Sequence, residues 1–281
     1  MAISTGAPLP MDSRGVLFAF GAYFIWGLFP IYWKLLQHVP AVQLIGHRVA
    51  WSFVLLTVIF LTAHSLSELC RLAADRRIVG IYSIAAVLMG VNWLIYVWSV
   101  NAGYIVEASL GYFINPLLSV LLGVLFLRER LRRLQWVSVG LAAAGVLFLW
   151  LAHGRPPWIS LSLAVTFGFY GLFKKMAPLR ALDGLTLETG ILFVPAVGFL
   201  AWQEWAGQGA FLHAGPVSDL LMAGAGLVTT IPLLLFASAA RRIPLTTIGI
   251  MQYITPTSQF LLGVLVYGEA FGSAQALGFG I

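Results

Sequence analysis

Apolar runs of about 20 residues recur along the whole chain, and a helix of that length crosses the hydrocarbon core of a bilayer. They predict membrane spans at 16–33, 42–63, 78–99, 104–127, 134–151, 158–176, 185–203, 218–239 and 244–267, with a last span that opens at 271. Of the 281 residues, 60% are hydrophobic and only 9% are charged, whereas a soluble domain carries about 25% charged residues. We therefore predict an all-α integral membrane protein with a bundle of ten helices. Its last helix is expected to be truncated, because residues 271–281 reach only about half-way through a bilayer.

Several classes of function are disfavoured by the motifs that the sequence lacks. The single cysteine, Cys70, excludes an intramolecular disulfide and a cysteine-rich metal site. No G-x-x-x-x-G-K-[ST] phosphate loop, H-E-x-x-H motif or G-x-S-x-G motif occurs. The net charge of +6 fits loops that lie against anionic lipid headgroups better than a nucleic-acid surface. We expect no enzyme activity, no cofactor, no metal and no nucleic-acid partner.

The distribution of Lys and Arg predicts the orientation, because cytoplasmic connections carry the excess of these residues. With the N-terminus in the cytoplasm, thirteen lie in inner connections: Arg14, Arg71, Arg76, Arg77, Arg128, Arg130, Arg132, Arg133, Lys174, Lys175, Arg180, Arg241 and Arg242. Only Lys34 and Arg155 lie in outer connections, and Arg48 falls within a span. We therefore predict a cytoplasmic N-terminus.

One segment occurs twice, 140 residues apart. "NPLLSVLLGVLFLRE" (115–129) and "TPTSQFLLGVLVYGE" (255–269) share a proline, a glycine and a glutamate in register. Each copy holds five spans, and because five is odd the second copy enters the membrane from the opposite side. The sequence thus predicts two inverted five-helix repeats, 1–151 and 152–281, around a central cavity. Inverted repeats with a site near mid-membrane are the architecture of secondary transporters.

Three stretches resemble one family, the drug/metabolite transporter superfamily of the EamA type, and its RarD-like branch above all. They are "WGLFPIYWKLL" followed by "VQLIGHRVAWSFVLL", the segment 115–149, and "TPTSQFLLGVLVYGE". The resemblance implies a multi-pass exporter in the bacterial inner membrane, without ATP or metal. Its typical cargo is amino acids and cationic or aromatic drugs. It also implies that spans one to four and six to nine surround the cavity.

Polar and aromatic side chains within the spans are the candidate substrate-binding residues, since polar groups in a membrane helix need a wet or protein partner. In span three Asn92, Trp93 and Tyr96 are the candidates, and in span four Tyr112 and Asn115. Gln252 belongs to the same pattern in the second copy, and "YFIWGLF" and "FGFYGLF" place Trp26 and Tyr170 in equivalent positions. The alternatives are helix-to-helix contacts for the polar groups and an interfacial belt or packed core for the rings.

Three further residues are predicted to be structural or gating. Arg48 could anchor a carboxylate, but a structural lock is the favoured interpretation, in which it bonds carbonyls at a helix end or pairs with a buried acid such as Glu107. Pro116 and Pro256 each lack a backbone N–H, so each leaves a carbonyl one turn earlier without its helical donor and is a natural bending point.

A second ionisable residue, Glu188, lies about one turn into span seven. It is expected to pair with Lys174 or Lys175 across the connection to span six.

These features predict a secondary carrier that exports small metabolites by alternating access. The cargo is expected to be zwitterionic or neutral, with amino acids first and aromatic drugs second. A channel-like pore for small neutral solutes is the alternative, and a membrane-embedded enzyme is a more distant one. The expected partners are the small-molecule cargo and membrane lipid, and a monomer is plausible. The sequence leaves open whether export is proton-coupled or facilitated.

Overall fold

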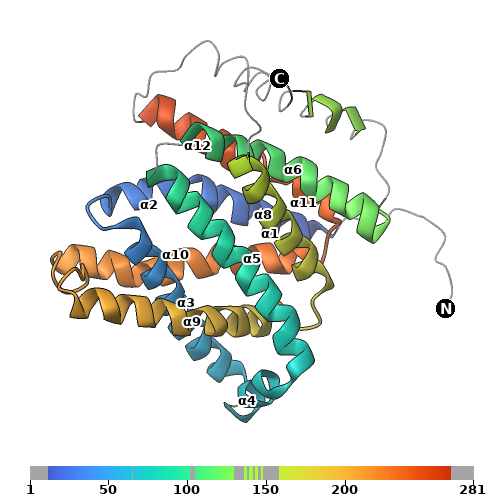
Figure 1. Cartoon of the computed structure of the whole chain (residues 1–281). Coiled ribbons are helices and arrows are strands. Elements are labelled where there is room, and N and C mark those ends of the chain that lie inside the picture. Colours follow the sequence, from blue (N-terminus) through green and yellow to red (C-terminus); the bar gives the residue numbers. More distant parts are fainter. Residues whose placement is uncertain are drawn as a thin grey trace.

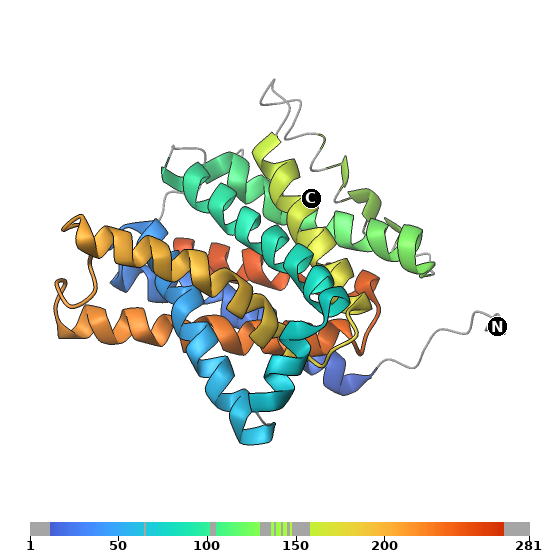
Figure 2. The same ribbon diagram turned by 60° about the horizontal axis from the view of Figure 1, so that its bottom comes forward.

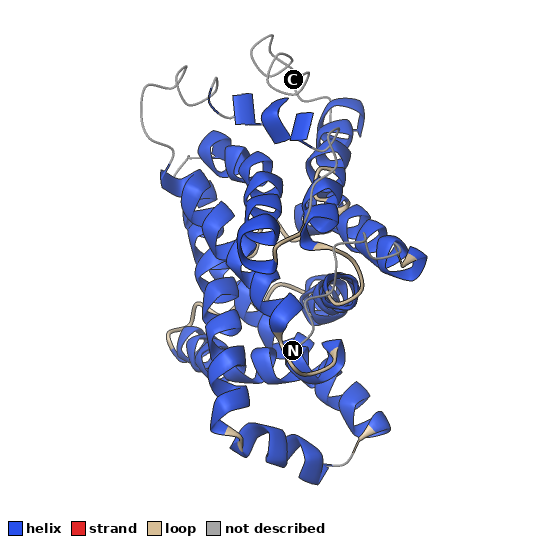
Figure 3. Ribbon diagram, turned by 90° about the vertical axis from the view of Figure 1, so that its right-hand side faces the viewer, coloured by secondary structure: helices blue, strands red, loops and turns tan. Residues whose placement is uncertain are grey.

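The computed structural model describes residues 12–64, 66–101, 105–129, short pieces between 136 and 147, and 158–266 (Figure 1). Within these residues all regular structure is helical, and short connections join the helices (Figure 3). The predicted spans at 134–151 and from 271 onward fall largely or wholly outside the described residues, as does the predicted truncation.

The helices agree with the predicted spans to within a few residues at most ends. They are α1 (Ser13–Gly27), α2 (Phe29–Leu35), α3 (Ala41–Ala63), α4 (Leu66–Ala74), α5 (Arg76–Asn101), α6 (Ile105–Leu127), α8 (Trp158–Met176), α9 (Ala181–Trp205), α10 (Pro216–Ala240), α11 (Leu245–Met251) and α12 (Ile254–Leu261), followed by a π-helix at Leu262–Val266. Five described segments are long and apolar enough to cross a bilayer: Ser13–Leu35, Ala41–Thr62, Arg76–Tyr96, Ala181–Trp205 and Pro216–Ala240.

The outer surface of the bundle is apolar, as a lipid-facing surface must be. Leu17, Leu125, Val194 and Leu220 are 63–74% exposed and lie on four different helices. Soluble monomers rarely expose extended apolar patches. Helices with this surface and this length make the protein an all-α membrane protein, as the sequence predicts.

Two of the predicted spans are interrupted, and a proline lies next to each interruption. Span one divides at Leu28 into α1 and α2, with Pro30 in the first turn of α2. Span nine divides after α11, and α12 begins at Ile254 with Pro256 in its first turn. Because Pro256 has no N–H, the Gln252 carbonyl accepts instead from the N–H of Thr255, at 3.2 Å. The related Pro116, by contrast, lies inside the continuous helix α6.

The helices pack in a pattern that joins the first and second halves of the chain. In the upper part of Figure 1, α6 packs against α8 and α11, and α1 packs against α12. Lower in the same view, α3 packs against α9 and α10, while α5 packs against α8 and α9 (Figure 2). The halves therefore interlock and do not form two separate bodies.

The helix backbones approach closely where glycine removes the side chain. A Cβ atom added to Gly249 in α11 would lie 2.8 Å from the carbonyl oxygen of Pro116 in α6. A Cβ atom on Gly226 in α10 would lie 2.5 Å from the backbone carbon of Trp51 in α3. Small residues allow such contacts between membrane helices, where van der Waals packing drives association.

The main hydrophobic core fills one half of the bundle, which we call the closed half. It contains the start of α1, the end of α3, the start of α5, the ends of α6, α8 and α10, and the helix α11. These helix ends lie on the same side of the bundle because successive spans alternate in direction. Tyr23, Tyr170 and Phe236 are its largest rings, all at most 2% exposed. Alanines of α1, α5 and α10 fill the space between the helices. The opposite half holds the cavity described below.

Candidate substrate cavity

A cavity of about 310 Å³ lies between the helices at mid-bundle and extends into the half opposite the core. Its lining comprises Tyr23, Trp26, Phe29, Pro30, Trp33, Arg48, Met89, Asn92, Trp93, Tyr96, Tyr112, Asn115, Leu163, Phe167, Leu233, Gln252, Thr255 and Pro256. These residues come from α1, α2, α3, α5, α6, α8, α10 and the segment 252–256. The cavity is thus surrounded by spans one to four, six, eight and nine, while α9 contributes no lining residue.

The structure brings seven of the eight predicted substrate-binding residues to this one cavity. They are Trp26, Asn92, Trp93, Tyr96, Tyr112, Asn115 and Gln252. Of the predicted structural or gating residues, Arg48 and Pro256 also line it, whereas Pro116 is buried within α6. The eighth predicted residue, Tyr170, is placed elsewhere.

Arg48 provides the cation of the cavity. Its guanidinium carbon lies 4.8 Å from the ring centroid of Trp33 and 4.8 Å from that of Trp93. The Nε–H donates to the hydroxyl of Thr229 at 3.0 Å, which connects α3 to α10. The ring of Phe29 lies 5.7 Å away, so three aromatic rings and one hydroxyl hold the group, since rings attract a cation through their quadrupole. The suggested pairing with Glu107 involves a side chain outside the described residues.

Asn92 uses its carboxamide to join two helices. Its Nδ2 donates to the Leu163 carbonyl at 3.0 Å and to the Thr166 hydroxyl at 2.9 Å, both on α8. The side-chain NH₂ group of Asn92 thus makes a contact between helices, which was one of the two interpretations of this residue. The residue also lines the cavity. Beside it, the rings of Tyr96 and Tyr112 meet edge to face at 5.8 Å and form an aromatic wall.

The polar groups deeper in the cavity are less fully engaged. The Ser119 hydroxyl donates to Oε1 of Gln252 at a long 3.5 Å. The Thr255 hydroxyl donates to the Tyr23 carbonyl at 2.8 Å, which joins span nine to span one. Within the described lining of the cavity, the Asn115 Oδ1 is buried without a hydrogen-bond partner. Buried polar atoms are normally paired, so this one is available to water or to a ligand.

Aromatic rings separate the cavity from the core. Trp26 contacts Phe236 at 5.7 Å and Phe167 at 6.1 Å between ring centroids. Tyr170 lies behind them, stacked on Phe236 at 6.1 Å, and is 1% exposed. It therefore differs from the expected wall residue: its hydroxyl donates to Glu188 at 3.3 Å, which holds the ring in the core.

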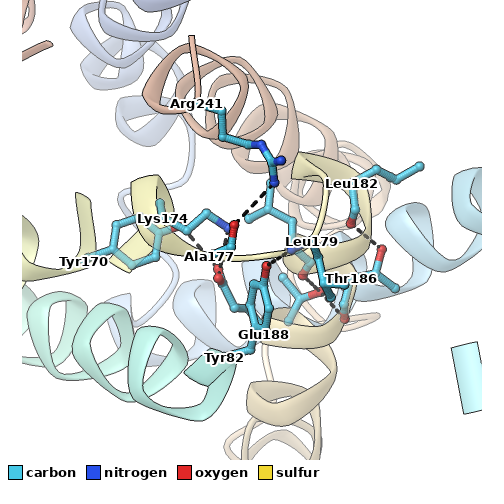
Figure 4. Close-up of polar contacts among 11 residues, drawn as sticks. Tyr82, Tyr170, Lys174, Ala177, Leu179, Leu182, Thr186, Glu188 and Arg241 are labelled. Atoms are coloured by element: carbon cyan, nitrogen blue, oxygen red, sulfur yellow. Dashed lines mark hydrogen bonds and ion pairs between the residues drawn. The ribbon is translucent and has the colours of Figure 1, made fainter. Parts of the chain in front are cut away.

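Behind Tyr170 lies a buried ion pair between α8 and α9 (Figure 4). Lys174 Nζ is 2.9 Å from Glu188 Oε1, with the two side chains 3% and 5% exposed. The Tyr82 hydroxyl accepts from the Leu179 N–H at 3.1 Å in the same connection. The predicted pairing of Glu188 is thus confirmed, with Lys174 as the partner.

Lys175 belongs to a different cluster, centred on Glu129 at the end of α6. The Glu129 carboxylate accepts from the N–H groups of Leu245 at 2.8 Å and Thr246 at 2.9 Å. These N–H groups open α11, so the carboxylate caps that helix from another span. Lys175 Nζ lies 3.8 Å from the same carboxylate and donates to the Ile243 carbonyl at 2.7 Å. The closed half is thus held at its edge by two charged contacts.

Several lining residues were not predicted as candidates. Trp33 and Phe29 lie on α2, and Phe167 lies on α8. Trp33 follows Trp26 by seven residues, which is about two helical turns, so the spacing of the two tryptophans was an available signal. Phe167 gives no such signal, because phenylalanine is common in membrane helices wherever they face.

Lipid-facing helices that enclose a cavity of polar and aromatic groups with one arginine define a membrane transport protein for small molecules. Residues 13–151 match the EamA-like transporter family. The chain is 47% identical to Protein RarD of Streptomyces exfoliatus, over 95% of this chain and 85% of that protein. It is 43% identical to Protein RarD of Escherichia coli strain K12 and 45% identical to the uncharacterized transporter YojE of Bacillus subtilis strain 168. In both cases 95% of this chain and 90% of the relative are covered.

A solved crystal structure shares the fold at a TM-score of 0.70 and 19% identity, covering 95% of this chain and 94% of that one. The chain therefore belongs to the EamA-like transporters of the drug/metabolite transporter superfamily, in its RarD-like branch. The family predicted from the sequence is thereby confirmed.

Proposed function

We propose that this protein is a secondary carrier that exports small metabolites across the bacterial inner membrane by alternating access. Amino acids are the first cargo class and aromatic drugs the second. The observation that carries the proposal is the cavity of about 310 Å³, which is lined by aromatic and polar side chains and lies against a packed core on one side. Such a volume suits a ligand of the size of an aromatic amino acid.

The arrangement of the helices supports alternating access between two inverted repeats, 1–151 and 152–281. Exchanging the repeats converts span one into span six, two into seven, three into eight and four into nine. Under this exchange the contact of α6 with α8 becomes that of α12 with α1, and the contact of α3 with α10 becomes that of α9 with α5. Each of these contacts occurs in the structure.

The difference between the two related prolines supports the same mechanism. The segment with Pro116 is a continuous helix, while the segment with Pro256 is divided at the cavity. In a carrier built from inverted repeats, the two copies hold different conformations in one facing state and exchange them in the other. Pro116 and Pro256 are the proposed bending points.

The packed core supports a carrier over the alternative of a pore. A pore needs a continuous path, whereas here rings and alanines fill the closed half below the cavity. With the N-terminus in the cytoplasm, the closed half faces the cytoplasm and the cavity lies toward the outside.

The nature of the lining supports a cargo without strong charge. A sugar phosphate would need several Arg or Lys side chains, and Arg48 is the cation that the described lining contains. The neutral amides and rings suit an amino acid or an aromatic drug.

Uptake into proteoliposomes tests the proposal. Purified protein is reconstituted and supplied with a panel of labelled amino acids, and counterflow is measured against unlabelled cargo. We expect saturable uptake with counterflow, lost in Trp93→Ala and retained in the matched control Trp202→Ala, whose ring is 54% exposed on the surface. Uptake that rises linearly with concentration, without counterflow, would instead favour a pore.

A further inference from the structure

Arg48 places a positive charge in a cavity that has no carboxylate among its described lining residues. The acids whose side chains are described have other contacts: Glu188 with Lys174, Glu129 with the start of α11, Glu204 with His213, Asp219 with the Leu212 N–H, Asp12 with Arg242, Asp75 with the Arg77 N–H, and Asp183 near His64. A charge inside a membrane protein is costly unless it is paired, so Arg48 requires a counter-charge.

The contacts of Arg48 leave one part of the guanidinium available. Trp33 and Trp93 contact the group at equal distances, and Thr229 accepts from Nε–H. A guanidinium has five N–H donors, of which Nε–H supplies one. No described residue accepts from the other four, which belong to the two terminal nitrogens. This edge of the group matches a carboxylate, which accepts two parallel hydrogen bonds from it.

We propose that the cargo is recognised by a single carboxylate, which binds the terminal nitrogens of Arg48, on an aromatic body that packs against the rings of the cavity. This inference rests on the proposed carrier function and shifts its cargo class from zwitterions toward aromatic carboxylates. It also reverses the expectation that Arg48 is chiefly a structural lock. The hydroxyl of Thr229 and the two tryptophans then position the guanidinium for the ligand.

The second polar group of the cargo is optional. The unpaired Oδ1 of Asn115 can accept from an amine, a hydroxyl or an indole N–H, but it carries no charge. An ammonium group therefore gains no ion pair in the described lining, and Arg48 repels it. Aromatic carboxylates should bind at least as well as the corresponding amino acids, and cationic drugs should bind poorly.

Four indole compounds that differ in charge test this order directly. Indole-3-propionate is an anion, tryptophan a zwitterion, indole-3-propionamide neutral and tryptamine a cation. Binding to the purified full chain is measured by isothermal titration calorimetry. Because a charge-assisted hydrogen-bonded pair is stronger than a neutral one, we expect the propionate to bind about 10- to 100-fold more tightly than the amide. Tryptophan should fall between them, and tryptamine should be the weakest.

Variants then assign the preference to Arg48. Arg48→Gln should remove the difference between propionate and amide while amide binding persists, which also reports that the variant is folded. Arg48→Lys should keep part of the preference, since a lysine retains charge without the planar fork. Equal binding of propionate and amide to the native protein would overturn the inference, even if Arg48→Gln does not fold.

Glu107 supplies the sharpest competing outcome. If its carboxylate neutralises Arg48, the native protein will not prefer the propionate, and Glu107→Gln will create the preference. That result would restore the structural lock and refute the inference.

The carrier proposal fails separately, if none of the four compounds shows counterflow in proteoliposomes. A propionate preference in calorimetry would still stand in that case. Counterflow of the amide and the propionate with equal affinity would support the carrier proposal and refute the recognition of a carboxylate by Arg48.

Discussion

Replacing Lys174 by methionine should destabilise the protein strongly, because it leaves the Glu188 carboxylate buried without its cation. The two groups are 2.9 Å apart and at most 5% exposed. Breaking a buried pair from one side costs about 3–5 kcal/mol. The remaining hydrogen bond from Tyr170 is long, at 3.3 Å, and offsets little of this cost. We expect a loss of about 3 kcal/mol, because the pair lies near the end of α8, where water can reach the carboxylate after partial opening.

The assay is reversible unfolding in mixed micelles, followed by tryptophan fluorescence, for single and double variants. Glu188→Gln alone should cost a similar amount, while the double variant K174M/E188Q should recover at least half of the summed loss. Buried pairs replaced together by neutral groups of similar size are often close to neutral in stability. Lys175→Met is the matched control: its side chain is 22% exposed and bonds two carbonyls, and Glu129, 3.8 Å away, keeps two backbone N–H donors without it, so its loss should be about 1 kcal/mol.

Two outcomes would refute this reasoning. The first is a loss for Lys174→Met no larger than that for Lys175→Met, which would mean that Glu188 finds water or another donor. The second is strict additivity of the two single losses, which would mean that the pair contributes no coupling energy.

Three further predictions concern packing, ionisation and orientation. Gly249→Ala should lower stability by about 1–2 kcal/mol because its Cβ would meet a backbone oxygen of α6 at 2.8 Å, whereas Gly198→Ala, with no described atom within 4 Å, should be neutral or stabilising in the same unfolding assay. The Glu204 carboxylate, 2.8 Å away, raises the pKa of His213 above its usual value, so this pair stabilises the loop fully below about pH 6.5 and loses its effect as pH rises through the raised pKa. NMR titration should show Glu204→Gln lowering that pKa, and no change would contradict the pairing. Cys70, which is exposed on α4, should react with a membrane-impermeant maleimide only after permeabilisation, and labelling in intact cells would reverse the predicted orientation.

The spans could be predicted from the sequence because hydrophobic length determines them almost alone. A bilayer requires every backbone N–H and C=O to be paired within a helix, so each long apolar run has essentially one available structure. The polar cavity residues could be predicted for a related reason: the side chains of Asn115 and Gln252 need polar partners, so they could not face lipid. Seven of eight substrate candidates lie together for this reason.

Tyr170 could not be placed by the same reasoning, because its environment depends on residues distant in sequence. Its equivalence to Trp26 in the repeat suggested a shared position. Glu188, however, lies 18 residues later and has no acidic counterpart in the first copy, where the same offset leads to Leu44. The hydrogen bond to Glu188 accordingly draws Tyr170 into the core.

The interruptions at Leu28 and after α11, and the surface helix α4, were also missed as elements. Proline marks a place where a helix can break, but not whether it does: Pro116 and Pro256 occupy related positions with different results. The helix α4 lies in the predicted 64–77 connection and is too short and too mixed in polarity to register as a span. Its alternation of apolar and polar residues at helical spacing was the available signal.

Under the proposed alternating access, the alanines between α1 and α10 limit how much apolar surface must be hydrated when these two helices separate. Ala19 and Ala22 on α1, and Ala237 and Ala240 on α10, are at most 1% exposed, and each pair is spaced three residues apart on one helix face. Hydrating four methyl groups costs about 3 kcal/mol, far less than hydrating four leucines. A cost of this size is within what the differential binding of one small ligand can supply. In the proposed carrier, these small side chains thus keep the cost of separating α1 from α10 within reach of the binding energy of the cargo.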